Sequence, residues 1–412
     1  MSSFTLPARR GGRPSVVHLD VITLLIVFSI VLLGLVIVTS SSMSIATKEA
    51  GDPFLYLERQ FMLVIFGSIA ATMAFAIRTE WLEKFSLPLL FVAAAMLVLV
   101  LIPGIGHQVN GSRRWLRLAG FNFQASEATR VMVLVFIASY AVRREAELRT
   151  SLLGLIKPLL VVAVFFVLLL AEPDFGAATV LAATAFGVLF IAGARLRDVI
   201  GIAALGSVLI ALVAVASPYR MRRLTSFLDP WQDPFNSGFQ LTQSLIAIGR
   251  GGWTGVGLGE SVQKLFYLPE AHTDFLFAVL AEELGLLGIL LTIALFVALA
   301  WRAFHIAKLA ADAGLKFQCY LAVAFGIWVA MQSFINMGVN MGALPTKGLT
   351  LPFMSYGRSS MIVALAWVGV LLRVYHEAVH ASRGSAAASL RGSSAAKVRD
   401  DSRDDALDAV RA

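Results

Sequence analysis

Ten separate stretches of this chain are apolar over enough residues to cross a lipid bilayer, and no other feature limits the possible folds as strongly. A helix needs about 17–25 consecutive, predominantly apolar residues to span the hydrocarbon core. The stretches lie near residues 19–39, 57–77, 86–103, 126–142, 157–172, 176–194, 199–216, 274–301, 317–338 and 351–375. The sequence therefore predicts an all-α, polytopic membrane protein with ten transmembrane helices.

The amino-acid composition also indicates a membrane protein. Of the 412 residues, 58% are hydrophobic and 15% are charged, whereas a soluble domain is about half apolar and a quarter charged. The first apolar stretch follows three arginines but is too long for a secretory signal peptide, so we expect it to be retained as an anchor. The single cysteine, Cys319, excludes an internal disulfide framework and a thiolate metal cluster.

The placement of Lys and Arg residues predicts that both termini are cytoplasmic, because basic residues concentrate on the cytoplasmic side of membrane proteins. Most of the 34 basic residues fall on that side when residues 1–18 are placed inside. Residues 19–378 then form the membrane domain, with one large extracytoplasmic loop at residues 217–273. Residues 379–412 lack aromatic residues and large apolar clusters, which predicts a disordered cytoplasmic tail.

Two outer loops carry basic residues on the side where membrane topology does not require them. The loops follow the third and seventh predicted helices, and their cations are Arg113, Arg114, Arg117 and Arg130, then Arg220, Arg222, Arg223, Arg250 and Lys264. Snorkelling arginines in an interfacial aromatic belt are the simpler interpretation. The number of outer cations favours a phosphate-bearing ligand, with Trp115 as an apolar or sugar-stacking platform.

The long outer loop contains two recognisable patterns. An amphipathic run from Phe239 to Ile248 predicts a segment that folds back onto the membrane surface. The glycines of GRGGWTGVGLGES favour turns and close packing. A nucleotide loop would follow a strand and precede Gly-Lys-Ser/Thr, and neither condition is met. No Cys/His spacing typical of a zinc site is present in the sequence.

The acidic residues near the predicted helix ends leave more than one interpretation open. Asp174, in the turn EPDFG, suits a helix cap that accepts backbone N–H bonds. Asp274 could cap the eighth helix in the same way, or it could act chemically with Glu270 and His272 beside it. Glu282 and Glu283 lie further inside that helix, where a charge costs on the order of 2.5–3.5 kcal/mol and indicates function. These two carboxylates either line a cavity or pair with buried groups.

One outer carboxylate surrounded by cations in a bilayer suits a narrow chemistry. A glycosidase needs two carboxylates, since an alcohol is a poor leaving group without an acid. A sugar on a lipid diphosphate already has a good leaving group. It needs one general base for the attacking hydroxyl and cations for the departing diphosphate.

Several long motifs carry a resemblance to a known family. They are AEPDFGAATVL, PYRMRRLTSFLDPW, DPFNSGFQLTQSLIAIGRGGWTGVGLGESVQKL, YLPEAHTDFLFAVLAEELG and NMGVNMGALPTKGLTLPFMSYGRSSMI. Over about residues 15–378 the chain resembles the SEDS family (shape, elongation, division and sporulation), and within it the cell-division members. The resemblance implies a ten-helix peptidoglycan glycosyltransferase of the bacterial inner membrane that polymerises lipid II at the division septum, with its active site on the periplasmic side.

The resemblance also implies roles for particular residues and partners. Asp274 matches the family's essential aspartate in H-T-D-F and becomes the general base, and Trp115 matches the tryptophan of R-R-W. The further substrate-binding candidates are Arg113, Arg114, Arg130, Arg220, Lys264, Glu270, His272, Lys347, Ser359 and Ser360. The implied partners are a class B penicillin-binding protein, other division proteins and membrane lipids, with no nucleic acid. A divalent cation, Mg²⁺ or Mn²⁺, is the implied cofactor, without any nucleotide or organic group.

Three positions depart from the family pattern. Arg358 replaces the second glycine of S-Y-G-G-S-S, so its backbone is ordinary or it adds a cation beside the cavity. Ala125 stands where proline is common, and Arg130 stands where lysine is common, which keeps the charge but not the geometry. Two other functions remain open for such a chain, a lipid II flippase and a scaffold for division proteins.

Overall fold

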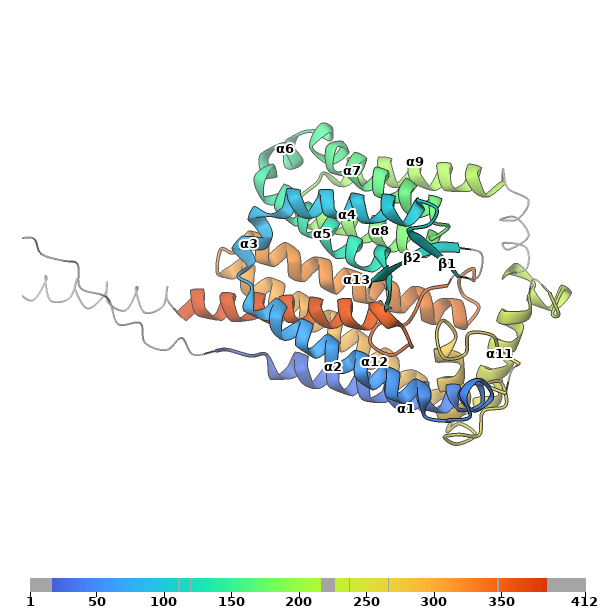
Figure 1. The fold of residues 1–412 in the computed structure, drawn as a ribbon. Helices are drawn as coiled ribbons and strands as arrows, with labels where there is room; N and C mark the ends of the chain where they lie inside the picture. Colours follow the sequence, from blue (N-terminus) through green and yellow to red (C-terminus); the bar gives the residue numbers. More distant parts are fainter. Residues whose placement is uncertain are drawn as a thin grey trace, which may run out of the picture.

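The computed structural model describes residues 17–109, 112–118, 121–215, 227–236, 238–265, 267–346 and 348–383. Its long helices lie side by side along one direction, and most connections are short (Figure 1). Val17 and Arg383, the first and last described residues, lie at the same end of the bundle, where the Arg383 guanidinium is 3.3 Å from Nε2 of His18. The opposite end carries the strands β1–β3 and the helix α11, and we call it the sheet end.

The helices follow the chain in simple order. They are α1 (Val21–Ala50), α2 (Leu55–Ala76), α3 (Thr79–Lys84), α4 (Ser86–Leu101), α5 (Ala125–Arg143), α6 (Glu145–Thr150), α7 (Leu152–Ala171), α8 (Phe175–Ile191), α9 (Leu196–Val215), η1 (Pro230–Gln232), α11 (Phe239–Gly251), α12 (Leu276–Asp312) and α13 (Lys316–Asn340). A further helix, Arg358–Arg383, completes the bundle and is called the C-terminal helix. The short helices α3 and α6 connect longer neighbours.

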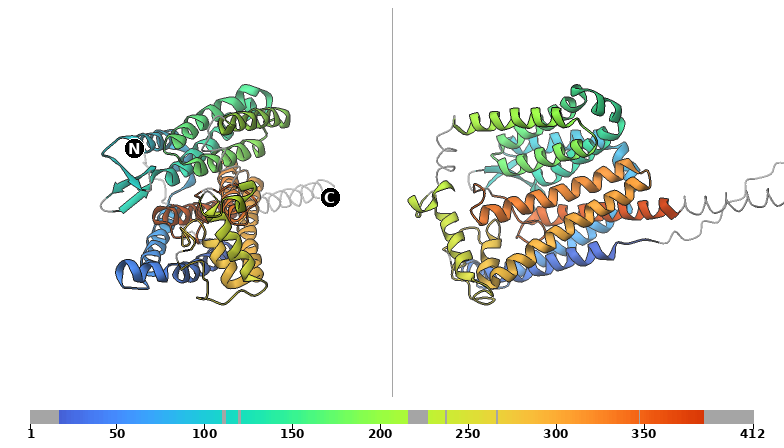
Figure 2. Two further views of the ribbon diagram at one scale, coloured as in Figure 1. Left: turned by 90° about the vertical axis from the view of Figure 1, so that its right-hand side faces the viewer. Right: turned by 180° about the vertical axis from the view of Figure 1, so that it is seen from behind.

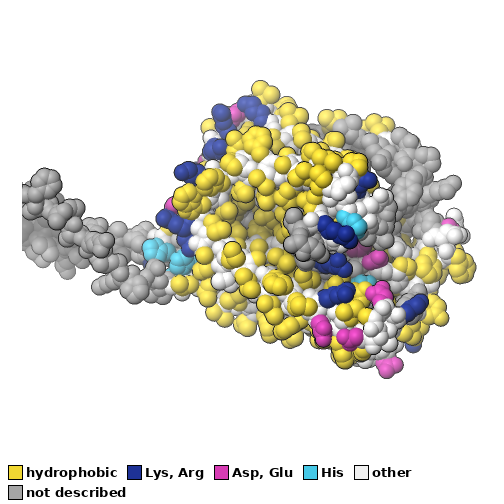
Figure 3. All heavy atoms as spheres, in the orientation of Figure 1, with side chains coloured by type: hydrophobic (Ala, Val, Ile, Leu, Met, Phe, Trp, Pro, Cys, Tyr) yellow, Lys and Arg dark blue, Asp and Glu magenta, His cyan; other side chains and the backbone are white. Residues whose placement is uncertain are grey.

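The predicted polytopic membrane protein is confirmed. Every predicted apolar stretch coincides with a helix, and within the described ranges seven helices are long and apolar enough to cross a membrane. Two more, Ser86–Leu101 and Phe175–Ile191, are apolar but shorter. The crossing number of ten and the cytoplasmic termini stay predictions. Figure 3 shows the apolar surface that covers the middle of the bundle, with basic side chains toward both of its ends.

A three-stranded antiparallel sheet departs from the predicted all-α class. It is formed by β1 (Gly106–Val109), β2 (Ser112–Leu118) and β3 (Phe121–Gln124), between α4 and α5. In the register, Trp115 of β2 lies opposite His107 on one side and Gln124 on the other. The sequence was interpreted there as a loop, because short strands leave a weaker pattern than membrane helices. In the left view of Figure 2, which faces the sheet end, the strands lie at one edge of the bundle and apart from α11.

Helix α12 is broken at Gly285, whose φ of 63° is non-helical. The loop segment after α11 runs against the break, where the backbone N–H groups of Val256 and Leu286 donate to Glu282 and Gly252 respectively, each at 3.0 Å. A Cβ on Gly285 would lie 2.3 Å from the backbone nitrogen of Gly255. Close approach of two backbones therefore requires glycine here. On the loop side, a Cβ on Gly255 would lie 2.0 Å from the carbonyl oxygen of Glu283, which confirms the close-packing interpretation of the loop glycines.

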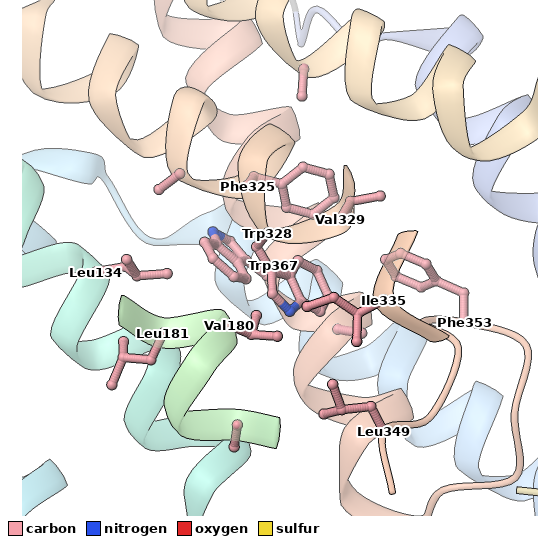
Figure 4. Packing of buried hydrophobic residues seen from close by; sticks show 14 of the residues in the cluster. Leu134, Val180, Leu181, Phe325, Trp328, Val329, Ile335, Leu349, Phe353 and Trp367 are labelled. Carbon is pink, nitrogen blue, oxygen red and sulfur yellow. The ribbon is translucent and has the colours of Figure 1, made fainter. Parts of the chain in front are cut away.

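The hydrophobic core centres on α13. In the most apolar 18-residue stretch of this helix 78% of the residues are buried, whereas the corresponding share in the peripheral helix α2 is 17%. Trp328 of α13 stacks on Trp367 of the C-terminal helix with ring centroids 4.8 Å apart, and Phe325 and Phe353 pack around them (Figure 4). Such aromatic contacts add to the stabilisation from apolar burial. The core therefore fixes α13 and the C-terminal helix, two elements from which the site is built.

Candidate active site

A cavity of about 290 Å³ opens at the sheet end between elements that are distant in the sequence. In this part of the molecular surface, basic and acidic side chains gather beside the apolar belt (Figure 3). The cavity is lined from β2 and the start of α5, from the α7–α8 turn, from the loop before α12 and from the segment that leads into the C-terminal helix. The lining residues discussed below are Arg114, Trp115, Gln124, Glu127, Asp174, Glu270, Asp274, Gly348, Tyr356, Arg358, Ser359 and Ser360.

Asp274 does not cap α12. That helix begins at Leu276, its N-cap residue is Phe275, and the cap has no side-chain hydrogen bond. The backbone carbonyl of Asp274 accepts from Nδ2 of Asn336 at 2.9 Å and from Nδ2 of Asn340 at 3.1 Å. Its carboxyl group makes no hydrogen bond or ion pair with any described residue, and it lines the cavity. The cap interpretation of Asp274 is therefore wrong.

The surroundings of Asp274 suit proton transfer. Burial, and secondarily the charges of Glu270 and Asp174, raise the pKa of Asp274 to about 7, while Arg114 acts in the opposite direction. A general base works best when its pKa lies near the operating pH. Gly348 leaves room beside the carboxyl group, since a Cβ there would lie 2.9 Å from Oδ2. The geometry therefore leaves this carboxylate available to a ligand.

Asp174 lines the same cavity but is fully engaged. Its Oδ1 accepts from the backbone N–H of Ala177 at 3.1 Å, which caps α8. Its Oδ2 accepts from Oγ of Ser126 and from Nε2 of Gln124, both at 3.2 Å. The prediction that Asp174 is a helix cap is confirmed.

Two predicted residues of β2 face this cavity. Arg114 donates from Nε to the carbonyl of Glu172 at 3.0 Å and from Nη2 to the carbonyl of Pro173 at 2.6 Å. These bonds attach the sheet to the α7–α8 turn, and the guanidinium still lines the cavity. Trp115 lines it as well, held in register opposite Gln124. The sheet thus brings a cation and an aromatic ring to the cavity that holds Asp274.

Three predicted phosphate ligands lie outside this cavity. Arg130 is buried, where it pairs with Glu127, donates to Oε1 of Gln332 at 2.7 Å and lies over the ring of Trp328. Arg113 donates to a backbone carbonyl of α4 at 3.4 Å. Lys264 is also buried in an ion pair. These cations hold protein groups in place rather than facing the cavity.

Glu282 and Glu283 pair with buried groups, which decides between the two interpretations of these carboxylates. Glu283 lies 3.0 Å from Nζ of Lys264 and accepts from Oγ of Ser40 at 2.6 Å. Glu282 lies 3.1 Å from Arg250 and accepts from Ser261 and two backbone N–H groups. The pair fastens the loop after α11 to α1 and α12 and does not line the Asp274 cavity.

Of the remaining described candidates, Glu270, Ser359 and Ser360 line the cavity, and His272 lies behind Tyr356, which lines it. The ring of His272 lies between Tyr56 and Tyr356, at centroid distances of 4.9 and 5.7 Å, and its carbonyl accepts from the Tyr356 backbone. Burial lowers the pKa of His272 below its ordinary value, which favours a neutral ring. Glu270 lines the cavity and accepts from Oγ1 of Thr273. Ser359 and Ser360 also line it. Arg220 and Lys347 lie outside the described residues.

The sequence interpretation missed a row of amides on α13. Gln332, Asn336 and Asn340 recur every four residues on one buried face. Gln332 donates to the carbonyl of Thr350 at 3.0 Å, and Asn336 donates to that of Leu349 at 2.6 Å. The row thereby joins the segment before the C-terminal helix to the loop of Asp274. Polar amides at helical spacing inside an apolar span were the available signal.

Two missed carboxylates lie beside the predicted ones. Glu127 lines the cavity and holds Arg130. Glu172 is completely buried, and neither of its carboxyl oxygens has a hydrogen-bond partner among the residues that the structure describes. Burial, and then the charge of Asp174, raise the pKa of Glu172 to about 8, so this side chain is mostly protonated at neutral pH. Glu172 had no sequence signal beyond its place two residues before Asp174.

A second hollow adjoins the cavity. This apolar groove of about 640 Å³ runs between α2 and the C-terminal helix and is lined by Arg59, Met62, Leu63, Phe66, Asn122, Tyr356, Arg358 and Ile362. It shares Tyr356 and Arg358 with the Asp274 cavity. The site therefore joins an apolar compartment to a polar one.

Comparisons with known proteins agree on one family. The family model of FtsW, RodA and SpoVE, described as cell cycle protein, matches residues 20–380. A protein of Thioalkalivibrio sulfidiphilus named "Probable peptidoglycan glycosyltransferase FtsW" is 53% identical over 364 residues, covering 88% of this chain and 91% of that protein. A protein of Methylococcus capsulatus with the same name is 50% identical over 373 residues, covering 90% and 94% of the two chains.

Solved structures give the same fold. A chain of the structure described as "Structural coordination of polymerization and crosslinking by a peptidoglycan synthase complex" superposes with a TM-score of 0.73 at 29% identity, covering 87% of this chain and 98% of that one. The rod shape determining protein RodA of Thermus thermophilus superposes with a TM-score of 0.64 at 28% identity, covering 88% and 98%.

Proposed function

The chain belongs to the family of FtsW, RodA and SpoVE cell cycle proteins, and on that premise we propose that it is a peptidoglycan glycosyltransferase that polymerises lipid II, with Asp274 as general base. Relatives about half identical to it along most of their length are named for this activity. The observation that carries the mechanism is the carboxyl group of Asp274, unpaired among the described residues and with a pKa of about 7.

The reaction joins the sugars of two lipid-linked substrates. Asp274 accepts the proton of the acceptor's 4-hydroxyl group as that oxygen attacks the anomeric carbon of the donor. The bond from this carbon to the diphosphate breaks, and its electron pair leaves with the diphosphate. Attack opposite to the leaving group inverts the anomeric centre. Arg114 places a positive charge in the cavity, where charge stabilisation acts most strongly on the transition state.

The apolar groove supports a lipid-linked substrate. Its wall is mostly aliphatic and aromatic, it lies along the peripheral helix α2, and it meets the Asp274 cavity at Tyr356 and Arg358. A substrate with a polyprenyl chain and a sugar diphosphate head has the same division into apolar and polar parts. Binding across both compartments would place the sugar end beside Asp274.

The topology and partners belong to the same proposal. We place ten helices across the bacterial inner membrane, with both termini in the cytoplasm and the sheet end in the periplasm. The protein acts at the division septum with a class B penicillin-binding protein. A structural neighbour described as part of a complex for polymerization and crosslinking supports such a partner.

The divalent cation implied by the resemblance lacks a protein cage in the described part of the chain. No group of three or more His, Cys, Asp or Glu side chains is placed there to hold a metal ion. Of the cavity carboxylates, Asp174 is occupied as a cap and Glu127 is paired with Arg130. The residues do not form a binding set, so no step of the mechanism uses a metal ion.

Reconstitution with lipid II and the penicillin-binding partner tests the proposal. Asp274→Ala should produce no glycan chains while it folds and inserts like the native chain. Normal chain formation by this variant would remove Asp274 from the mechanism. Transport of labelled lipid II across vesicles without polymerisation would instead favour a flippase, and septum formation supported by Asp274→Ala in cells would favour a scaffold.

A further inference from the structure

Arg358 occupies the junction of the two hollows. It is the first residue of the C-terminal helix, and its side chain lines both the apolar groove and the Asp274 cavity. It makes no hydrogen bond or ion pair with another residue in the described ranges, in contrast to the buried Arg130 and Lys264. Its φ is not positive, so an arginine fits this backbone where the family pattern has glycine.

The helix that begins at Arg358 does not itself attract the positive charge of this side chain. The N-terminus of a helix carries a partial positive charge of about half an elementary charge, so a cation in the first turn is repelled. No described carboxylate compensates this repulsion through an ion pair. An anion bound at the junction would be attracted by both the guanidinium and the helix N-terminus.

Arg59 provides a second unpaired cation on the opposite wall of the groove. It lies near the start of α2, is exposed, and forms no ion pair with a described carboxylate. Its guanidinium carbon lies 5.9 Å from the centre of the Tyr56 ring, a contact that leaves the N–H donors available. Two guanidinium groups across one opening suit a phosphate ligand, because each presents a planar fork of donors.

The groove changes from polar to apolar along its length. Arg59 lies on α2 toward the sheet end, and Phe66 is seven residues further, about 10 Å along the helix axis. On the facing wall, Ile362 lies one turn beyond Arg358. The two arginines therefore stand at the same end of the groove, and the opposite end is lined by apolar side chains. This division matches an amphiphile with an anionic head.

From this arrangement we propose that Arg358 and Arg59 clamp the diphosphate of a polyprenyl diphosphate whose chain lies in the groove, and that this lipid is the glycosyl donor. The inference rests on the proposed function and assigns one of its two lipid sites. In a donor, the reacting carbon is bonded directly to the diphosphate. In an acceptor, the reacting hydroxyl lies on the distal sugar. The clamp adjoins the Asp274 cavity through Arg358, so its lipid is the donor.

The clamp then acts on the leaving group. When the bond between the anomeric carbon and the diphosphate oxygen breaks, the electron pair and the negative charge move to the diphosphate. Arg358 and Arg59 stabilise that charge, while the proton of the attacking hydroxyl goes to Asp274. The product that remains in the groove is a polyprenyl diphosphate without a sugar.

Binding of sugar-free polyprenyl diphosphate to the full chain in nanodiscs tests the clamp without any glycosyl transfer. Arg358→Gly should weaken binding of this probe at least tenfold, and polyprenol binding should not change. Arg358→Lys should bind the probe with an affinity between those of the native chain and Arg358→Gly, because lysine keeps the charge but lacks the planar fork of N–H donors. Arg78→Ala is the matched control, since Arg78 is an exposed arginine remote from the groove that pairs with Glu80, and it should bind like the native chain.

Equal binding of polyprenyl diphosphate by Arg358→Gly and the native chain would overturn the clamp. A parallel loss of polyprenol binding would overturn it as well, because the groove rather than a phosphate contact would then have failed. Thermal unfolding of each variant verifies the fold. Asp274→Asn should bind the probe normally, so the clamp and the proposed general base can fail separately.

Discussion

Two aspartates that precede helices line one cavity, and they differ in the hydrogen-bond partners of their carboxyl groups. Asp174 gives both carboxylate oxygens to protein donors at the start of α8. Asp274, before α12, has its backbone held by α13 and its carboxyl group unpaired among the described residues. A residue type and its position before a helix therefore do not define its role. The groups that the fold brings to the side chain decide it.

The cations show the same division. Lys264 and Arg130 are buried against carboxylates and support the fold. Arg114 and Arg358 line the cavity. Arg114 does both, since it donates to the carbonyls of Glu172 and Pro173 and still lines the cavity. Side chains held only by buried protein groups maintain the structure, whereas those that reach the cavity are available to a ligand.

The largest expected effect separates the two aspartates by activity. Asp274→Asn keeps the shape of the side chain but removes the base, so the polymerisation rate should fall by about 10²–10⁴-fold. Asp174→Asn is the matched control, because asparagine also caps helices, and it should keep most of the rate. Rates of glycan synthesis in the reconstituted system measure both. Equal losses of rate in the two variants would contradict the assignment of Asp274 as the base and Asp174 as a helix cap.

The next effect concerns the engaged cations. Lys264→Met leaves Glu283 buried without its partner, and breaking such a pair costs about 3–5 kcal/mol. Arg250→Met is the control, since Glu282 keeps Ser261 and two backbone donors after the change. Thermal unfolding in detergent should therefore show a larger loss for Lys264→Met. A smaller loss for Lys264→Met than for Arg250→Met would contradict a supporting role of Lys264.

The pH dependence of activity tests the raised pKa of Asp274. Because the pKa of Asp274 is raised to about 7, the base is protonated below that value, and the rate should fall about tenfold per pH unit as the pH drops below 7. A rate that stays level from pH 5 to 8 would rule out a base of this pKa.

The raised pKa of Asp274 also makes the stability of the folded chain depend on pH. Folding raises the pKa of this carboxyl group from an ordinary value of 3.8, so the folded state favours the protonated form. Its contribution is complete below the ordinary pKa and is lost as the pH rises through 7. Asp274→Asn lacks this loss and should unfold at a higher temperature than the native chain above pH 7.

The smallest expected effect is on the cap. Asp174→Ala removes the acceptor for the N–H of Ala177 and should destabilise the protein by about 1 kcal/mol. Asp174→Asn should recover most of this stability. Thermal unfolding of the two variants measures the difference. If Asp174→Ala is as stable as the native chain, the Asp174 side chain does not stabilise α8 as a cap.

The helices of this protein were predictable where the signal is local. The apolar stretches gave the helix positions, and the glycine-rich segment indicated close packing, which Gly255 and Gly285 confirm. The sheet of β1–β3 was missed, because its short strands have little signal of their own. The break of α12 was missed as well, since it depends on a loop that approaches the helix from outside.

The sequence alone determined that this chain lies in a membrane as a helical bundle, because apolarity over about 20 residues is a property of each segment by itself. Which charged side chains are paired and which are open to a ligand depends on contacts that form only in the folded chain. Lys264 meets Ser40 across 224 positions of the chain, and Arg130 meets Gln332 across 202. The availability of Asp274 depends on such distant partners, and a charged side chain carries no local mark of whether the fold supplies one.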